Sequence, residues 1–285
     1  MSFSNDVKTE LIRQYAKSRH CQLAELAGML ALEGRVTDGL LIFDTENTGL
    51  QEKYRILIKK AFALNAETVL ERGESMRILS TLKWKADGTT GTVEGLLVQQ
   101  TCCKRAFIRG AFLAAGSISD PEKSYHFEIV CRTMAQAGQL QGLMRDFEAE
   151  ARIVERKGHY VVYLKEGSQI VDMLNVMEAY VSLMNLENVR ILKEMRNSVN
   201  RKVNCETANI NKTVGAAVRQ IEDIRRIQAV RGLDSLPEPL REVAQLRLEY
   251  PEATLVELGA YLDPPVGKSG VNHRLHRISE LADEL

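Results

Sequence analysis

The chain has 285 residues, enough for about two domains, and its 45% apolar and 27% charged content is ordinary for a globular protein that works in water. Its 38 basic and 38 acidic side chains cancel, so net charge alone indicates no polyanionic partner. The sequence holds no apolar run of the ~18 residues that a membrane span needs, and its polar start is unlike a signal peptide. These features exclude a membrane-spanning protein and predict a cytoplasmic location.

The first ninety or so residues predict helices mixed with short strands. Apolar side chains at helical spacing predict helices over 6–15, from about Gln22, and over 49–64. Short apolar runs predict strands over 40–43, 67–71 and 76–84, followed by a loop over 87–91.

The next hundred residues repeat the same order of elements. The pattern predicts a helix through Ala115, a strand over 125–131, a helix over 134–149, a hairpin of 152–155 with 160–164 across Lys157-Gly158, and a helix over 168–186. The two halves therefore indicate a tandem α+β repeat.

One nine-residue pattern begins each half. Leu-Ala-Gly-Met-Leu-Ala-Leu-Glu-Gly starts at Leu26, and Ile-Arg-Gly-Ala-Phe-Leu-Ala-Ala-Gly starts at Ile108, 82 positions later. The small residues at Gly28 and Gly110 predict that two helices approach closely on the axis of the repeat. A left-handed helix stop is expected at the ninth glycine of each copy.

The C-terminal third has a different composition. Residues 190–231 carry ten Arg or Lys against four Asp or Glu, without proline, which predicts a basic helical connector. After it, Leu240 to Leu248 present one apolar helix face, Thr254 and Glu257 form a capping box, and a third helix begins near Ser269. Three short helices around a small core are typical of a helix-turn-helix.

The two nonapeptides resemble the LAGLIDADG helices of homing endonucleases. With the opening 1–8 (MSFSNDVK), the run 201–209 (RKVNCETAN) and the tail 270–275 (GVNHRL), the chain more closely resembles the WhiA family of bacterial sporulation and cell-division regulators. The resemblance implies an α+β, pseudo-twofold LAGLIDADG-like domain over 1–187, the connector over 188–231, and an all-α helix-turn-helix domain over 232–285.

The resemblance also identifies where nuclease chemistry would lie. In LAGLIDADG nucleases the eighth residue of each nonapeptide is an acid that binds divalent metal, and here these positions hold Glu33 and Ala115. A methyl group cannot ligate a hard cation, so we expect that double-strand cleavage is lost and that Glu33 is vestigial or structural. The alternatives are an endonuclease that recruits Asp120 or Glu122, and a protein-interaction scaffold.

The third tail helix is the predicted DNA reader. Its polar side chains can donate to base edges or phosphates in the major groove. They are Lys268, Ser269, Asn272, His273, Arg274, His276 and Arg277. In the connector, Arg196, Arg201 and Lys202, together with Arg190 and Lys193, are expected to meet backbone phosphates.

The five cysteines are odd in number and contain no C-x-x-C pair, so their spacing indicates neither a disulfide framework nor a zinc site. We expect buried reduced thiols, no metal and no cofactor; His273 and His276 lack the further ligands of a metal site. The resemblance to the WhiA family implies a non-enzymatic, sequence-specific transcription regulator of sporulation or cell-division genes, whereas residue chemistry alone predicts binding to duplex DNA. The regulator's expected partner is double-stranded DNA at promoters, with another transcription factor or RNA polymerase as a further candidate, and its expected place is the nucleoid.

Overall fold

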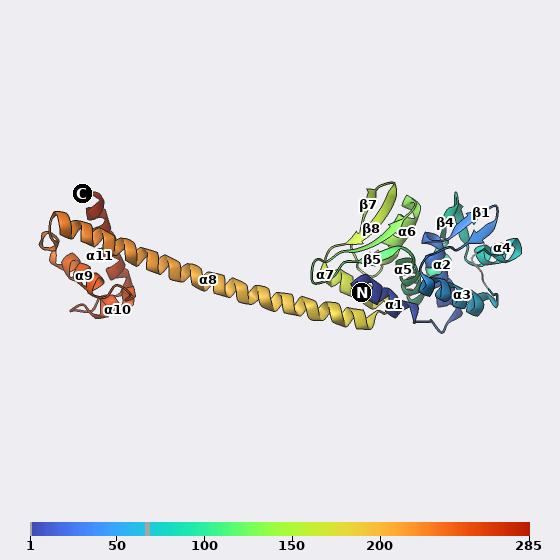
Figure 1. The fold of residues 1–285 in the computed structure, drawn as a ribbon, viewed down its shortest axis with the longest axis horizontal. Coiled ribbons are helices and arrows are strands. Elements are labelled where there is room, and N and C mark those ends of the chain that lie inside the picture. Colours follow the sequence, from blue (N-terminus) through green and yellow to red (C-terminus); the bar gives the residue numbers. More distant parts are fainter. Residues whose placement is uncertain (1, 66–68) are drawn as a thin grey trace. The chain divides into compact units, whose positions relative to one another are not determined.

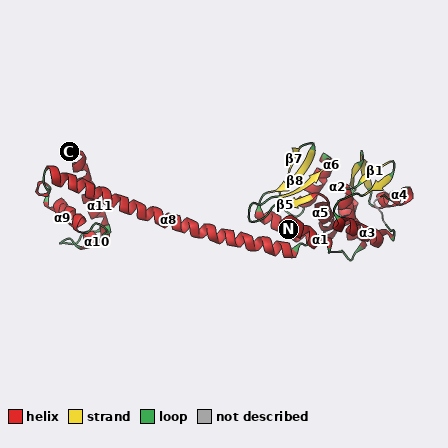
Figure 2. Ribbon diagram, viewed as in Figure 1, coloured by secondary structure: helices red, strands yellow, loops and turns green. Residues whose placement is uncertain are grey.

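The computed structural model describes residues 2–65 and 69–285. The chain divides into two compact units, Met1–Glu194 and Met195–Leu285 (Figure 1). The first unit mixes helices with strands, whereas the second is entirely helical over its described residues (Figure 2). This order of an α+β unit followed by an all-α unit confirms the expected fold class.

Two helices, α2 (Arg19–Leu32) and α5 (Thr101–Ala115), pack against each other at the centre of the first unit. A Cβ atom added to Gly28 would collide with the carbonyl oxygen of Phe107, and one added to Gly110 would collide with that of Glu25. The predicted close approach of the two nonapeptides is therefore correct, because each glycine admits the backbone of the other helix.

The ninth glycines do not form the expected left-handed stops. Gly116 has a φ of −89° and begins a strand, and the φ of Gly34 is also not positive. A Cβ at Gly34 would lie 2.6 Å from the carbonyl oxygen of Leu30, and one at Gly116 would collide with the ring of Phe112. Space, not backbone handedness, requires glycine at both positions.

The second half of the unit holds a four-stranded antiparallel sheet in the order β5-β6-β8-β7. Its strands are Gly116–Ile118, Phe127–Cys131, His159–Leu164 and Arg152–Arg156, in that spatial order. Ile129 and Val162 face the core, so the alternate row is directed away from it. Helices α6 (Met134–Arg145) and α7 (Gly167–Met177) complete this half, and the predicted hairpin across Lys157-Gly158 is confirmed.

The first half contains two separate hairpins instead of one sheet. They are β1 (Arg35–Thr37) with β2 (Leu40–Ile42), and β3 (Trp84–Asp87) with β4 (Thr90–Val93). The helices of this half are α1 (Phe3–Ile12), α3 (Thr48–Phe62), α4 (Arg72–Thr81) and the 3-10 turn η1 (Gly95–Val98).

Two of the strands expected in this half differ from the structure or are described only in part. The strand expected over 76–84 is wrong, because most of that stretch is the helix α4. Of the strand expected over 67–71, residues 67 and 68 lie outside the described residues, while Val69 forms a bridge with Ile42.

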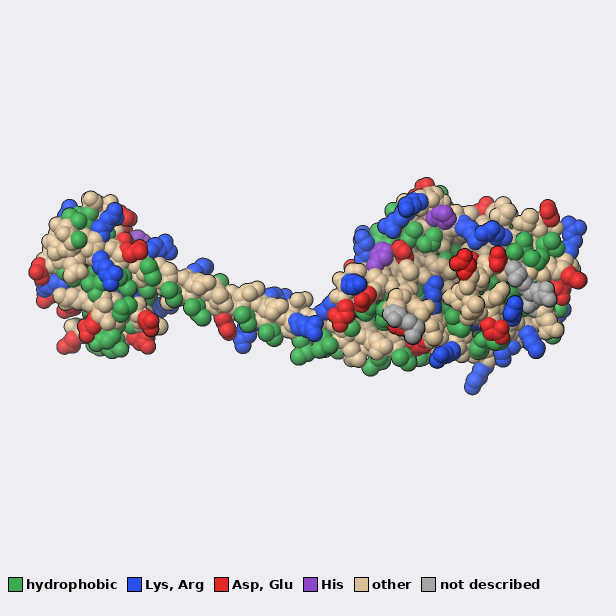
Figure 3. Space-filling model, viewed as in Figure 1, with side chains coloured by type: hydrophobic (Ala, Val, Ile, Leu, Met, Phe, Trp, Pro, Cys, Tyr) green, Lys and Arg blue, Asp and Glu red, His purple; other side chains and the backbone are tan. Residues whose placement is uncertain are grey.

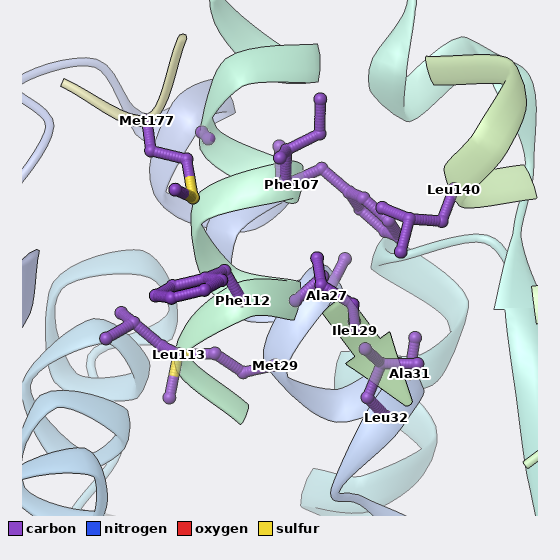
Figure 4. Close-up of a cluster of buried hydrophobic side chains, with 14 of the residues drawn as sticks. Ala27, Met29, Ala31, Leu32, Phe107, Phe112, Leu113, Ile129, Leu140 and Met177 are labelled. Carbon is purple, nitrogen blue, oxygen red and sulfur yellow. The ribbon is translucent and has the colours of Figure 1, made fainter. Parts of the chain in front are cut away.

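The core of the first unit is formed around α2 and α5 (Figure 4). Phe112 of α5 stacks on Phe127 of the sheet with ring centroids 5.3 Å apart, and Met29 of α2 is fully buried. Each such side chain contributes about 1.5–3 kcal/mol on burial, so the packing of the repeat helices stabilises this unit.

The helix expected over 168–186 ends earlier, at Met177. Glu178 has a left-handed φ of 68°, and a new helix, α8, then runs over Tyr180–Val230. Gln14 of the N-terminal segment donates to the carbonyl oxygen of Glu178 at 2.7 Å. The break between α7 and α8, which local periodicity did not indicate, therefore coincides with a contact to a distant part of the chain.

The second unit packs three helices against the end of α8. They are α9 (Glu238–Glu249), α10 (Leu255–Ala260) and α11 (Lys268–Asp283), preceded by the 3-10 turn η2 (Leu233–Ser235). Ile224 and Ile227 of α8 belong to the same buried cluster as Val243, Leu258 and Leu275. The capping box of Thr254 and Glu257 is present as predicted.

Candidate nucleic-acid interface

Helix α11 has one buried and one exposed face. Val271, Leu275 and Ile278 are buried at the expected spacing of three and four residues, and Leu281 packs partly against them. The polar side chains predicted to read DNA lie mainly on the other side. Lys268, Ser269, Asn272, His273, His276 and Arg277 are exposed.

A tight turn positions this helix against α10. A Cβ at Gly259 would collide with the carbonyl oxygen of Val266, whose backbone N–H donates to the carbonyl oxygen of Gly259 at 2.9 Å. The contact holds the segment before α11 close to α10. Between the start of α10 and the exposed face of α11 lies an open hollow lined by Leu255, Lys268, Ser269, Asn272, His273, His276, Arg277 and Glu280.

The charges on α11 are not all free. Arg277 forms an ion pair of 2.6 Å with Glu280, and His276 lies 3.4 Å from the same carboxylate. The hydrogen bond from Arg277 lowers the pKa of Glu280, which therefore stays ionised beside the polar face. Because both side chains are about half exposed to solvent, a phosphate can compete for the guanidinium at little cost.

Arg274 differs from the other predicted contacts. Its side chain is half-buried, and Nη1 donates to the carbonyl oxygen of Pro239 at 3.5 Å. It therefore helps to hold the start of α9 against α11, a role that its position in the sequence did not indicate.

The basic residues of the connector fall into two groups. Arg190 pairs with Glu187 one turn away on the same helix at 2.8 Å, and Lys193 donates to the carbonyl oxygen of Pro121 at 2.6 Å. Both basic residues belong to the first unit. Arg196, Arg201 and Lys202 are exposed on α8. Separations of five and six residues place Arg196 on a different side of the helix from the other two, so these charges do not form one stripe.

The ends of the two nonapeptide helices carry one carboxylate and one methyl group. Glu33 follows the last residue of α2, and Ala115 is the last residue of α5. Arg132 donates to the carbonyl oxygens of Gly34 at 2.9 Å and Glu33 at 3.3 Å. Its guanidinium therefore satisfies two backbone carbonyl groups at the C-terminal end of α2.

Several charged side chains act on the pKa of Glu33. Burial raises the pKa of the Glu33 carboxyl, while Arg132, Arg35 and Lys8 act in the opposite direction. Burial also lowers the pKa of Lys8, a smaller effect of Glu33 opposing it. Three basic side chains and a second acid, Asp44, thus act on the Glu33 carboxylate. Lys8 and Arg132 were not predicted from the sequence because they come from distant segments.

The two acids considered as substitutes lie beyond β5. Asp120 and Glu122 are exposed, and Asp120 Oδ1 accepts the backbone N–H of Glu122 at 3.0 Å. This contact is that of an ordinary turn that begins at Asp120. Neither carboxylate belongs to the end of α5, where Ala115 lies.

The row of the sheet directed away from the core carries both signs of charge. Its register aligns Ser117, Glu128, Tyr163 and Arg152. Glu128 lies 3.0 Å from His126 and 3.9 Å from Arg156, and Ser117 donates to it. The face of the first unit drawn in Figure 3 also shows basic and acidic side chains interspersed.

The cysteines differ from the expectation of buried thiols. Cys21, Cys103 and Cys131 are buried, but Cys102 and Cys205 are exposed. Among the helices of the described residues, none combines the length and apolar character needed to cross a membrane.

Fold and site together define a DNA-binding helix-turn-helix protein whose N-terminal domain follows the LAGLIDADG plan. The WhiA LAGLIDADG-like domain model matches residues 104–196, and the WhiA C-terminal HTH domain model matches residues 199–282. The chain belongs to the WhiA family.

Relatives extend this match over the whole chain. The "Probable cell division protein WhiA" of Lachnoclostridium phytofermentans is 50% identical and aligns with 100% of this chain and 99% of its own length. That of Alkaliphilus oremlandii is 48% identical over 100% and 98%. The crystal structure of full-length WhiA from Thermatoga maritima has the same fold, with a TM-score of 0.56 at 24% identity, covering 100% of this chain and 99% of that one.

Proposed function

We propose that this protein is a sequence-specific transcription regulator of cell-division or sporulation genes, bound to promoters at the nucleoid. The observation that carries the proposal is the exposed face of α11, where donors gather opposite a fully packed apolar face. Asn272 and Arg277 supply the amide and guanidinium that pair with adenine and guanine edges. The names of the relatives, which are cell-division proteins, support the choice of genes.

We propose further that the LAGLIDADG-like domain does not cleave DNA. A two-metal site needs carboxylates at both helix ends, and the methyl group of Ala115 replaces one of them. The Arg132 guanidinium at the other end supports the same conclusion. The domain then serves either as a second DNA surface or as a platform for another transcription factor or RNA polymerase.

One observation favours a protein contact made by helix α8, outside the LAGLIDADG-like domain. Part of α8 in the second unit exposes large apolar side chains, which are more typical of a protein contact than of a DNA contact. They include Met195, Val199, Val203, Ile210, Val214 and Val218, with exposed fractions between 48% and 61%. We therefore retain a protein partner as a second function beside DNA binding.

To test this, genomic DNA fragments are captured by the full chain and, in parallel, by a chain that ends at Arg231, and both sets of fragments are sequenced. We expect the fragments captured by the full chain to share one operator sequence near cell-division or sporulation genes. The shortened chain should not recover this sequence. Recovery of the same operator without the tail would reject α11 as the reader. Fragments without any common sequence would reject specific recognition.

A further inference from the structure

Four potential metal ligands meet at one end of the paired repeat helices. His20 and Cys21 lie in the first turn of α2, and Cys102 and Cys103 lie in the first turn of α5. The imidazole nitrogen and the three Sγ atoms all lie within 4.8 Å of one another. His20 Nδ1 is 3.2 Å from the Sγ of Cys103, 3.3 Å from that of Cys21 and 3.9 Å from that of Cys102.

The internal repeat explains why these residues converge. His20 and Cys102 are separated by 82 positions, as are Cys21 and Cys103, and this is the offset of the two nonapeptides. The two helices run in the same direction, because their first turns meet here and they contact again at Gly28 and Gly110. Equivalent positions therefore face each other across the pseudo-twofold axis.

The separations suit a tetrahedral zinc ion. Zinc binds sulfur at about 2.3 Å and imidazole nitrogen at about 2.0–2.1 Å, so the ligand atoms of one tetrahedron lie roughly 3.4–3.8 Å apart. The three nitrogen–sulfur distances of 3.2, 3.3 and 3.9 Å lie just outside that range, so small side-chain shifts would bring the four atoms onto one ion. Three cysteines and one histidine are also a common donor set of structural zinc sites, with a preference for this ion over the hard cations Mg²⁺ and Ca²⁺.

The surroundings suit the charge and the access of such an ion. Three thiolates, one neutral imidazole and Zn²⁺ carry a net charge of −1, and the N-terminal ends of two helices favour negative charge. Cys21 and Cys103 are buried, which gives a sheltered site, whereas His20 and Cys102 are exposed, which gives the ion a route in from solvent.

We propose that His20, Cys21, Cys102 and Cys103 bind one structural Zn²⁺ that joins the first turns of α2 and α5. Glu33 lies at the other end of α2, twelve residues beyond Cys21 or about 18 Å at the helical rise, so the site is separate from the nuclease-like position. The ion stabilises the contact between the two repeats. Sequence spacing did not indicate this site, because His20 and Cys21 are adjacent, Cys102 and Cys103 are adjacent, and the two pairs lie far apart in the chain.

The test begins with the metal content of the full chain, expressed with added zinc and purified without chelators. Elemental analysis is expected to find one zinc per chain in the wild type and in Cys205→Ser, whose exposed cysteine lies on α8 outside the cluster. Cys102→Ser and His20→Asn change exposed ligands and are expected to lose most of the zinc. Equal zinc in Cys102→Ser and Cys205→Ser would overturn the proposal.

Cobalt substitution of the wild type gives a readout that does not depend on any variant folding. We expect the visible spectrum of tetrahedral Co²⁺ with charge-transfer intensity for three thiolates, displaced by one equivalent of zinc. A zinc-free chain whose thiols are all reduced, and which gives no such spectrum with cobalt, would overturn the proposal. So would mass spectrometry that finds a disulfide among these cysteines in freshly purified protein.

Stability provides a third readout. Because a bound ion stabilises only the folded state, a strong chelator is expected to lower the melting temperature of wild type and of Cys205→Ser by about 5 °C or more. The same chelator is expected to leave Cys102→Ser unchanged. An equal shift in all three proteins would assign the effect to another site.

Discussion

Arg109 of α5 donates through Nη2 to Glu25 of α2 at 3.1 Å, and the two side chains are 3% and 0% exposed. Lys53 of α3 lies 2.8 Å from the other oxygen of the same carboxylate. Arg109 also reaches Glu178, the residue that follows the end of α7, at 2.7 Å. One buried carboxylate thus connects both repeat helices with α3, and Arg109 extends the network to the break before α8.

Glu25→Ala is expected to destabilise the first unit by about 3–5 kcal/mol, because it leaves Lys53 buried without its counter-charge and Arg109 with Glu178 alone. Urea unfolding followed by the fluorescence of Trp84, the single tryptophan, reports on this unit. Glu52→Ala is the control: its exposed carboxylate is 4.0 Å from Arg55, and its loss should cost less than about 1 kcal/mol. Equal midpoints for the two variants would contradict the role of the network.

Gly28→Ala and Gly110→Ala are each expected to lower stability by about 2 kcal/mol or more, because the new methyl group meets a carbonyl oxygen of the facing helix. The matched change is Gly138→Ala on the exposed side of α6, where a Cβ meets nothing within 4 Å. It should raise stability by roughly 0.5–1 kcal/mol through helix propensity. The melting temperatures of the three variants distinguish the expected losses of stability from the expected gain. A Gly28→Ala variant that melts above the wild type would disprove the close approach of the two helices.

Asn272→Ala combined with Arg277→Ala is expected to weaken binding to a mapped operator by about 100-fold, at roughly 10-fold for each base contact. The far-UV circular dichroism should not change, because both side chains are exposed. Arg55→Ala, an exposed arginine on α3, serves as the control and should bind like the wild type. Unchanged operator affinity in the double variant would remove α11 from its proposed role.

Glu280→Gln is expected to strengthen DNA binding by about 3-fold, since it frees Arg277 from its ion pair and removes a negative charge near phosphate. Titrations at several salt concentrations should show the gain at low salt and lose it at high salt. Weaker binding at low salt would mean that Glu280 positions Arg277 for contact.

Much of the fold was predictable because the glycine positions and apolar spacing report on local packing. The strand expected over 76–84 failed for a physical reason: the helix α4 buries Ser75, whose hydroxyl donates to the Leu70 carbonyl and accepts the Leu41 N–H. A polar residue on the inner face conceals helical periodicity. The early end of α7 was equally hidden, because Glu178 is held by Arg109 and Gln14 from distant segments.

The candidate site was predictable in part. The exposed polar face of α11 follows from its own periodicity, but the half-buried position of Arg274 depends on the carbonyl of Pro239 in another helix. Arg132 and Lys8 near Glu33, and the meeting of His20 with Cys103, likewise join residues far apart in sequence. Spacing rules that examine one segment at a time do not detect such sites.

We propose that this LAGLIDADG-like protein binds duplex DNA without cutting it. The most direct test is titration of a supercoiled plasmid that carries the operator, with and without Mg²⁺ or Mn²⁺, reading retention and strand breaks in the same samples. We expect the protein to retain the plasmid only when α11 is present. We also expect the plasmid to stay supercoiled under every condition. Metal-dependent nicking that Glu33→Ala abolishes would contradict the proposal and would show that one carboxylate suffices for an active nuclease.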